Sequence, residues 1–194
     1  MKKIFTINNY ISEKKKVLEH INSDQFIKAI NLIEEFFEQG RQVFIFGNGG
    51  SATTASHCST DWVKMSNLST GKKYKCYCLN DNVGLVTAYA NDISYNEIFS
   101  GQLKALMEPN DLVIAISGSG NSKNTIHAMK TASEIGGTTL GIVGFDGGKL
   151  KDSCDHIVHI PSFDMQICED IHLMFCQMVM KHLSKSPVVI NNSL

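Results

Sequence analysis

The sequence has no long hydrophobic run and no excess of charge of either sign. No stretch of about 18 apolar residues occurs that could cross a bilayer, and the N-terminal residues lead into polar sequence rather than into the apolar region of a signal peptide. Eighteen Lys and Arg stand against nineteen Asp and Glu, a net charge of -1, so no basic face for nucleic acid is expected. We therefore expect a cytoplasmic protein with neither a membrane nor a nucleic acid as partner.

Cysteine pairs with the spacing of a zinc knuckle or a thioredoxin site are also lacking. No two cysteines form a Cys-x-x-Cys motif, and without a signal peptide there is no indication of an oxidising compartment. The sequence therefore predicts six reduced, buried thiols: Cys58, Cys76, Cys78, Cys154, Cys168 and Cys176.

The chain has 194 residues, 43% of them hydrophobic, which suffices for one sizeable core but not for two ordinary domains. Residues 9–40 predict two helices, because an apolar stripe recurs there at spacings of three and four: Phe26, Ile27, Ile30, Ile33, Phe36 and Phe37. We expect this helical extension to precede an α/β core over about residues 41–183, followed by a tail at 184–194.

Strand-like and helix-like segments alternate through the core, joined by short glycine-rich turns. The expected strands lie at residues 42–46, 75–79, 111–116, 138–143 and 156–160. Such alternation is typical of a parallel sheet covered by helices on both faces. The predicted fold class is therefore an α/β three-layer sandwich in a single domain.

Two loops rich in glycine and serine follow strands and precede helices. They read Gly-Asn-Gly-Gly-Ser at residues 47–51 and Ser-Gly-Ser-Gly-Asn-Ser at residues 117–122. In an open α/β sheet these positions lie at the carboxyl ends of the strands, where ligands bind. Backbone N–H groups, hydroxyls and helix N-termini there bind anions. One such loop could be merely a tight turn with a serine N-cap, but two in one small sheet favour a phosphate site.

Neither loop has the pattern of a nucleotide-binding motif. Residues 47–52 do not satisfy G-x-G-x-x-G, and G-x-x-x-x-G-K-[ST] is absent from the sequence. We therefore expect no nucleotide cofactor, and the expected ligand is a small phosphorylated molecule.

Three segments, at residues 46–57, 87–92 and 116–122, resemble the sugar isomerase (SIS) domain family. They read FGNGGSATTASH, TAYAND and ISGSGNS, and they are most similar to the phosphoheptose isomerases, which interconvert sedoheptulose 7-phosphate and a glycero-manno-heptose 7-phosphate. The resemblance runs from about residue 10 to residue 183. It implies a five-stranded parallel sheet and a homotetramer, with N-terminal helices packed between subunits and active sites shared between chains.

The resemblance implies that both loops bind a phosphorylated sugar. Gly118 stands where the family usually has threonine, so one hydroxyl contact is lost. Residues 91 and 92 match a motif whose polar side chains face the sugar. The implied substrate-binding residues are Asn48, Gly49, Gly50, Ser51, Asn91, Asp92, Ser117, Ser119 and Ser122.

The acid-base and metal positions depart from the family pattern. The family has a His-x-x-x-Glu pair where this chain has His57 and Asp61, and its later Gln and His are Glu169 and Gln177 here. Some phosphoheptose isomerases bind zinc through these four positions. The resemblance thus implies zinc, or a harder divalent cation such as manganese, on His57, Asp61, Glu169 and Gln177. Alternatively, His57 lines the cleft without metal and Asp61 is a solvated surface residue.

An aldose–ketose isomerase moves a proton between adjacent carbons through an enediol, which requires a base and a group that stabilises the oxyanion. The implied catalytic residues are Asp61, Glu169 and Gln177, although an aspartate is shorter than a glutamate and a glutamine cannot titrate. The leading hypothesis is a phosphoheptose isomerase that supplies lipopolysaccharide or capsule synthesis. The alternatives are a non-catalytic phosphosugar-binding protein, like the DnaA-binding SIS proteins, and an isomerase of another ketose phosphate.

Overall fold

The computed structural model describes residues 5–185, and its centre is a five-stranded sheet. All neighbouring strands pair in parallel, in the order β2-β1-β3-β4-β5. The strands are β1 (Gln42–Gly47), β2 (Lys75–Cys78), β3 (Leu112–Ser117), β4 (Thr138–Val143) and β5 (His156–His159). This sheet confirms the predicted fold class, and each strand lies within one or two residues of its expected position.

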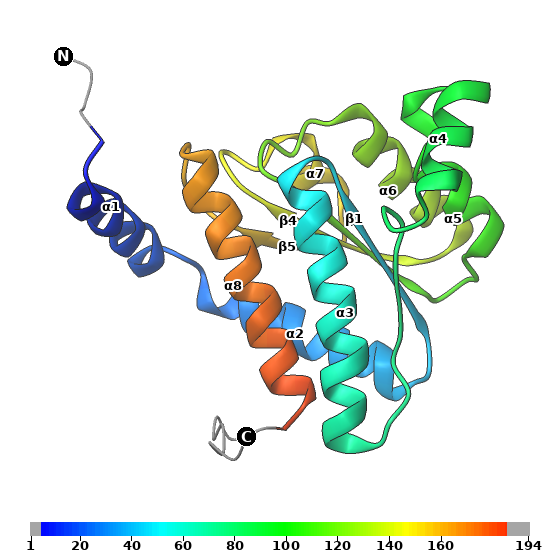
Figure 1. Cartoon of the computed structure of the whole chain (residues 1–194), viewed down its shortest axis with the longest axis horizontal. Helices are drawn as coiled ribbons and strands as arrows, with labels where there is room; N and C mark the ends of the chain where they lie inside the picture. Colours follow the sequence, from blue (N-terminus) through cyan, green and yellow to red (C-terminus); the bar gives the residue numbers. More distant parts are fainter. Residues whose placement is uncertain (1–4, 186–194) are drawn as a thin grey trace.

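Helices cover both faces of the sheet (Figure 1). One apolar core joins the sheet to α2 (Ser23–Glu38), α3 (Gly50–Thr70) and α8 (Met165–Leu183). The other joins it to α5 (Ser100–Leu106), α6 (Lys123–Ile135) and α7 (Gly148–Ser153). The remaining helices are α1 (Ile7–Glu19), α4 (Val83–Asp92) and the 3-10 turn η1 (Tyr95–Glu97).

The two cores follow from the alternation of side chains along each strand. In β1, Val43 and Ile45 pack with α2, α3 and α8, whereas Phe44 and Phe46 belong to the opposite core. All four are fully buried. A strand covered on both faces is a continuous apolar run, which is why residues 42–46 could be identified as a strand from the sequence.

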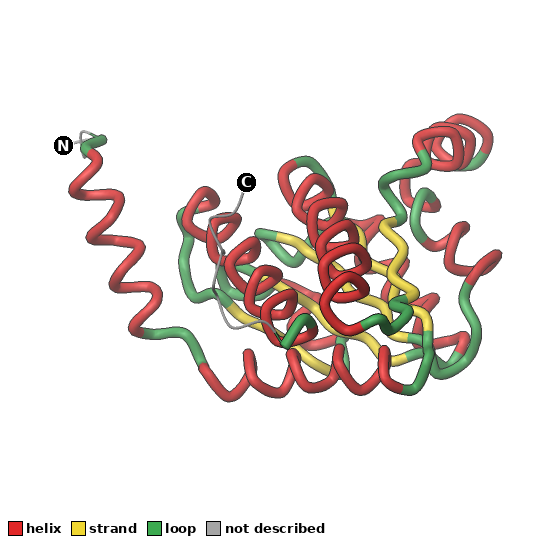
Figure 2. Tube along the Cα trace, turned by 60° about the horizontal axis from the view of Figure 1, so that its bottom comes forward, coloured by secondary structure: helices red, strands yellow, loops and turns green. Residues whose placement is uncertain are grey.

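The N-terminal helix α1 lies at the edge of the molecule (Figure 2) and has no buried residue, although Tyr10, Val17 and Leu18 pack partly against the core that contains α8. It is held to α8 by two polar contacts. The Tyr10 hydroxyl and Lys14 Nζ each donate to Asp170 Oδ2 at 2.7 Å. The predicted pair of N-terminal helices is thus present as α1 and α2.

A disulfide joins Cys58 of α3 to Cys176 of α8. The prediction of six reduced thiols is therefore wrong for this pair. The two cysteines are 118 residues apart in sequence and meet because α3 and α8 lie side by side on the sheet (Figure 1). The other four cysteines are free, and burial raises the pKa of Cys78 and of Cys154 to about 12, so these thiols stay protonated.

Within residues 5–185, no helix has the length and apolar character that a membrane span requires. Helix α8 ends at Leu183, with Ser184 as its C-cap. The predicted tail at residues 184–194 lies outside the described residues from position 186 onward.

Candidate functional site

A pocket of about 290 Å³ lies at the carboxyl ends of the adjacent strands β1 and β3. Both predicted loops line it, together with the first two turns of α8. Its lining residues are Asn48, Gly49, Gly50, Ser51, Ile116, Ser117, Gly118, Ser119, Ser122, Met165 and Glu169. The structure therefore brings together every predicted substrate-binding residue of the two loops, and it adds Glu169 from the predicted catalytic set.

The first loop lies against the end of β3 because residue 47 is a glycine. A Cβ at Gly47 would lie 2.8 Å from the carbonyl oxygen of Ile116 and 2.6 Å from Cβ of Ser51. Helix α3 then begins at Gly50, with Gly49 as its N-cap in a positive-φ conformation (φ 55°) and without a side-chain cap. Ser51 is therefore not the N-cap of α3, and its hydroxyl makes no capping bond.

The second loop is shaped by its own serines. Ser117 Oγ accepts a hydrogen bond from the Gly120 amide at 3.1 Å, and Ser119 Oγ accepts one from the Asn121 amide at 3.2 Å. Both hydroxyl protons can still be donated to a ligand. Ser122 occupies the N-cap of α6, but its side chain makes no capping bond there. This arrangement favours the phosphate-binding interpretation over a tight turn with a serine cap.

Two side chains of α8 enter the pocket beside glycines of the two loops. Met165 Sδ occupies the space that a Cβ at Gly118 would need. The Glu169 carboxylate lies directly beside Gly50. A Cβ at Gly50 would be 2.5 Å from Glu169 Oε1 and 2.9 Å from Oε2. A threonine at position 118 would require Met165 to move from its present position. The contribution of Met165 was not predicted.

The other predicted acid-base residues form a separate cluster between α3 and α8. Gln177 Nε2 donates to Asp61 Oδ2 at 3.0 Å and lies 2.8 Å from His57 Nε2. His57 Nε2 is 3.0 Å from Asp61 Oδ2. Gln177 follows Glu169 by eight residues of α8, which is about 12 Å along the helix. The four residues of the predicted set are thus divided between the cluster and the pocket.

Within one chain, this cluster is a hydrogen-bonded group with fewer ligands than a zinc site requires. Protein zinc sites use at least three ligands from Cys, His, Asp or Glu, and only His57 and Asp61 meet here, with the NH₂ group of Gln177 directed at them. Among residues 5–185, no three or more such side chains are grouped to hold a metal ion. The divalent cation stays a prediction.

Asn91 and Asp92 lie at the end of α4 and do not line the pocket. Asn91 Nδ2 donates to Asp92 Oδ1 at 2.8 Å, and both side chains are exposed. Their predicted contact with the sugar is therefore not made by the pocket within this chain, and it stays a prediction.

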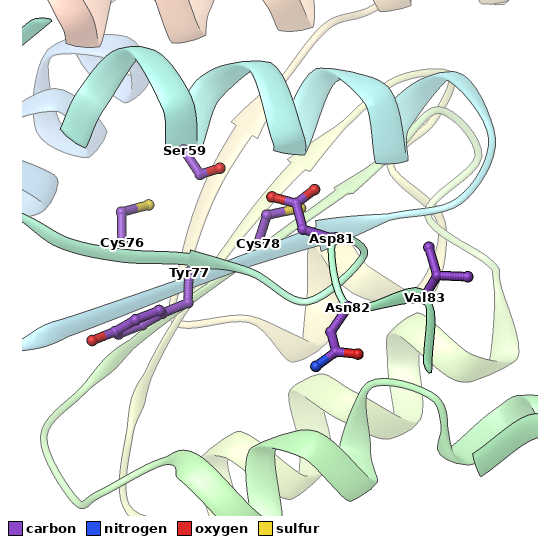
Figure 3. A pocket seen from close by; sticks show the side chains of 7 residues that line it. All are labelled: Ser59, Cys76, Tyr77, Cys78, Asp81, Asn82 and Val83. Atoms are coloured by element: carbon purple, nitrogen blue, oxygen red, sulfur yellow. The ribbon is translucent and has the colours of Figure 1, made fainter. Parts of the chain in front are cut away.

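A larger cavity, of about 490 Å³, opens beside the edge strand β2 (Figure 3). Cys76, Cys78 and Asp81 point toward Ser59 of α3, and Tyr77 points the opposite way. None of the predicted site residues lines this cavity. The pocket between the two loops, although smaller, is the candidate site because it combines amides and hydroxyls at the ends of strands with a helix N-terminus.

Comparison with known proteins agrees with this fold. A model described as "SIS domain" matches residues 9–144. The phosphoheptose isomerase of Clostridium acetobutylicum is 36% identical, covering 91% of this chain and 92% of its own length. A probable phosphoheptose isomerase of Thermoplasma acidophilum is 34% identical, with 88% and 95% covered.

Two solved structures share the fold at lower identity. A phosphoheptose isomerase from Francisella tularensis superposes with a TM-score of 0.85 at 21% identity, covering 93% of this chain and 97% of the other. The phosphoheptose isomerase of Neisseria gonorrhoeae has the same TM-score and the same coverage at 24% identity. The SIS domain match and the relatives at 34% and 36% identity establish that the chain belongs to the SIS domain family, among the phosphoheptose isomerases.

Proposed function

We propose that the protein is a phosphoheptose isomerase that converts sedoheptulose 7-phosphate to D-glycero-D-manno-heptose 7-phosphate. The observation that carries the proposal is a single pocket lined by both glycine-serine loops and by the carboxylate of Glu169. The loops supply N–H and O–H donors for a phosphate dianion. Glu169 supplies a group that can accept a proton from a carbon of the bound sugar.

The distance between Glu169 and the cluster of His57, Asp61 and Gln177 supports an active site shared between chains. His57 follows Gly50 by seven residues of α3, which is about 10 Å along the helix axis. A sugar bound by its phosphate in the pocket therefore has Glu169 as its near carboxylate. The cluster would then serve the pocket of a neighbouring copy.

Exposed apolar residues on two helices support a homo-oligomer, which we propose to be a tetramer. Helix α4 is predominantly apolar yet has no buried residue, and Val83 and Ile93 are 67% and 65% exposed. Helix α1 likewise exposes Ile7 and Ile11. Apolar faces of this kind are typical of subunit interfaces. Light scattering should give about four times the chain mass of 21.4 kDa.

An isomerase assay tests the proposed activity. Purified protein incubated with sedoheptulose 7-phosphate should form the aldose, and parallel assays with chelator, zinc and manganese test the metal. Glu169→Gln should lower kcat by about 10²- to 10⁴-fold, because glutamine cannot accept the proton, while inorganic phosphate still binds. Formation of no aldose under any metal condition would remove the proposed activity.

Mixing two inactive variants tests the shared site. Asp61→Asn should also lose turnover, and co-expression with Glu169→Gln should restore part of the activity, because some sites in hybrid oligomers would then be intact. If the two variants never complement one another, each site takes Asp61 and Glu169 from the same chain, and the proposal of a shared site is wrong.

A non-catalytic phosphosugar-binding protein is the second candidate. It is favoured by the hydrogen bonds that engage Asp61 and Gln177 with each other, since a base must be free to accept a proton. Binding of sedoheptulose 7-phosphate in calorimetry without any turnover, across the same metal conditions, would support this function instead.

A further inference from the structure

The side chain of Asn48 is bonded to two residues that the sequence analysis did not select. Asn48 Nδ2 donates to Asn124 Oδ1 at 2.9 Å, and Asn124 Nδ2 donates back to Asn48 Oδ1 at 2.9 Å. The hydroxyl of Tyr95 donates to the same Asn48 Oδ1 at 3.0 Å. The three residues belong to the first loop, to the first turn of α6 and to η1.

These bonds engage both lone pairs of Asn48 Oδ1 and one N–H of its Nδ2. A carboxamide has two N–H donors and two oxygen lone pairs. Asn48 Oδ1 accepts from Asn124 and Tyr95, while Nδ2 donates to Asn124 and, at 3.4 Å, to Thr125 Oγ1. Most of the hydrogen-bonding groups of Asn48 are therefore committed to the protein, although this residue lies in the lining of the pocket.

Asn124 is likewise committed to the protein. It is 3% exposed, and its Oδ1 accepts from the Thr125 amide at 2.9 Å as well as from Asn48. Asn124 lies two residues beyond Ser122, the last residue of the second loop. The paired amides therefore tie the first loop directly to the helix that begins at the end of the second loop.

We infer that Asn48 and Asn124 form an amide clasp, braced by Tyr95, that sets the spacing of the two loops around one phosphate. In this assignment Asn124 and Tyr95 are positioning residues, and the paired amide of Asn48 holds the first loop against α6. The inference rests on the proposed phosphate site. It matters because a displacement of about 1 Å at such a site can cost about a hundredfold in rate.

A double-mutant cycle separates a positioning role from direct binding. Asn48→Ala, Asn124→Ala and the double variant are compared by calorimetric binding of inorganic phosphate. If both residues act only through the clasp, each single change should weaken phosphate binding by about 2- to 10-fold. The double variant should then bind phosphate about as well as the single variant with the lower affinity. Effects that multiply, or unchanged binding in Asn124→Ala, would overturn the inference.

Tyr95 provides a variant with little risk to folding, because its side chain is largely exposed. Tyr95→Phe removes one hydroxyl and should weaken phosphate binding about 2- to 5-fold in the wild type, but not in the Asn48→Ala background. Tyr77→Phe, at another exposed tyrosine, is the matched control and should bind phosphate normally. Equal loss in both backgrounds would show that Tyr95 acts independently of Asn48, contrary to the clasp.

Kinetics and phosphate binding distinguish this inference from the proposed activity. In an active enzyme the clasp variants should raise KM for sedoheptulose 7-phosphate more than they lower kcat, and the pH dependence of kcat should stay as in the wild type. A wild type that binds phosphate but forms no aldose would remove the isomerase activity and leave the clasp intact. A wild type that does not bind phosphate would overturn both.

Discussion

At the scale of single residues, the second loop contains two glycines that are required for different reasons. Gly120 has a positive φ of 64°, and a Cβ there would collide with the backbone carbonyl of Gly147. At Gly118 the obstacle is the flexible thioether end of Met165. We therefore expect Gly120→Ala to lower the free energy of unfolding by about 1–3 kcal/mol. The variant should also bind phosphate more weakly, because the backbone of the loop must move to make room for the Cβ.

Gly118→Ala is the comparison variant at the same loop. Its cost should be smaller, because Met165 can change rotamer, and Met165→Ala should relieve most of it. Urea unfolding and phosphate calorimetry of the three variants provide the measurement. A larger cost at position 118 than at position 120 would contradict this account of the loop.

At the scale of elements, the disulfide between α3 and α8 fixes the two helices that carry His57, Asp61 and Gln177. Cys58 directly follows His57 in sequence, and Cys176 directly precedes Gln177. Trp62 Nε1 also donates a hydrogen bond to the carbonyl of Cys176 at 3.0 Å. A crosslink that closes a loop of this length stabilises by about 4–5 kcal/mol in the chain-entropy model. Reduction should therefore lower the urea midpoint markedly.

Thiol counting checks the crosslink directly. Denatured, unreduced protein should show four reactive thiols, and reduced protein six. Cys58→Ser/Cys176→Ser should unfold like the reduced wild type, whereas Cys154→Ser should keep its sensitivity to reductant. Six thiols before reduction would contradict the disulfide.

At the scale of the whole molecule, a buried histidine makes stability depend on pH. His172 of α8 is fully buried, and only the backbone of Val143 partly offsets the effect of this burial on its ring. Burial lowers the pKa of His172 from 6.5 to about 4. Below pH 6.5 the unfolded chain binds a proton that the folded protein does not bind until about pH 4.

Stability contributed by His172 is therefore complete above about pH 6.5 and declines as the pH falls toward 4, by about 3 kcal/mol in all. His172→Leu should flatten this part of the profile in urea unfolding at a series of pH values. The exposed His156, changed to Gln, is the control and should leave the profile as in the wild type. An unchanged acid dependence in His172→Leu would show that other groups are responsible.

Much of the architecture could be predicted from the sequence because it depends on local patterns. Apolar runs bounded by turn residues located the strands, and the apolar stripe of residues 26–37 located α2. Glycine and serine directly after two strands located the pocket, since the carboxyl ends of neighbouring parallel strands share one edge of the sheet. The predicted set His57, Asp61, Glu169 and Gln177 was only partly brought together, because spacing along one helix separates Glu169 from Gln177.

The sequence by itself determined the sheet, the two loops and the family, because each is encoded in residues close together along the chain. Only the tertiary structure decided which distant side chains meet: Cys58 with Cys176, Met165 beside Gly118, and Asn48 with Asn124 and Tyr95. The physical reason is that such partners are selected by the packing of whole helices on the sheet. No pattern within one segment records which segment will lie against it.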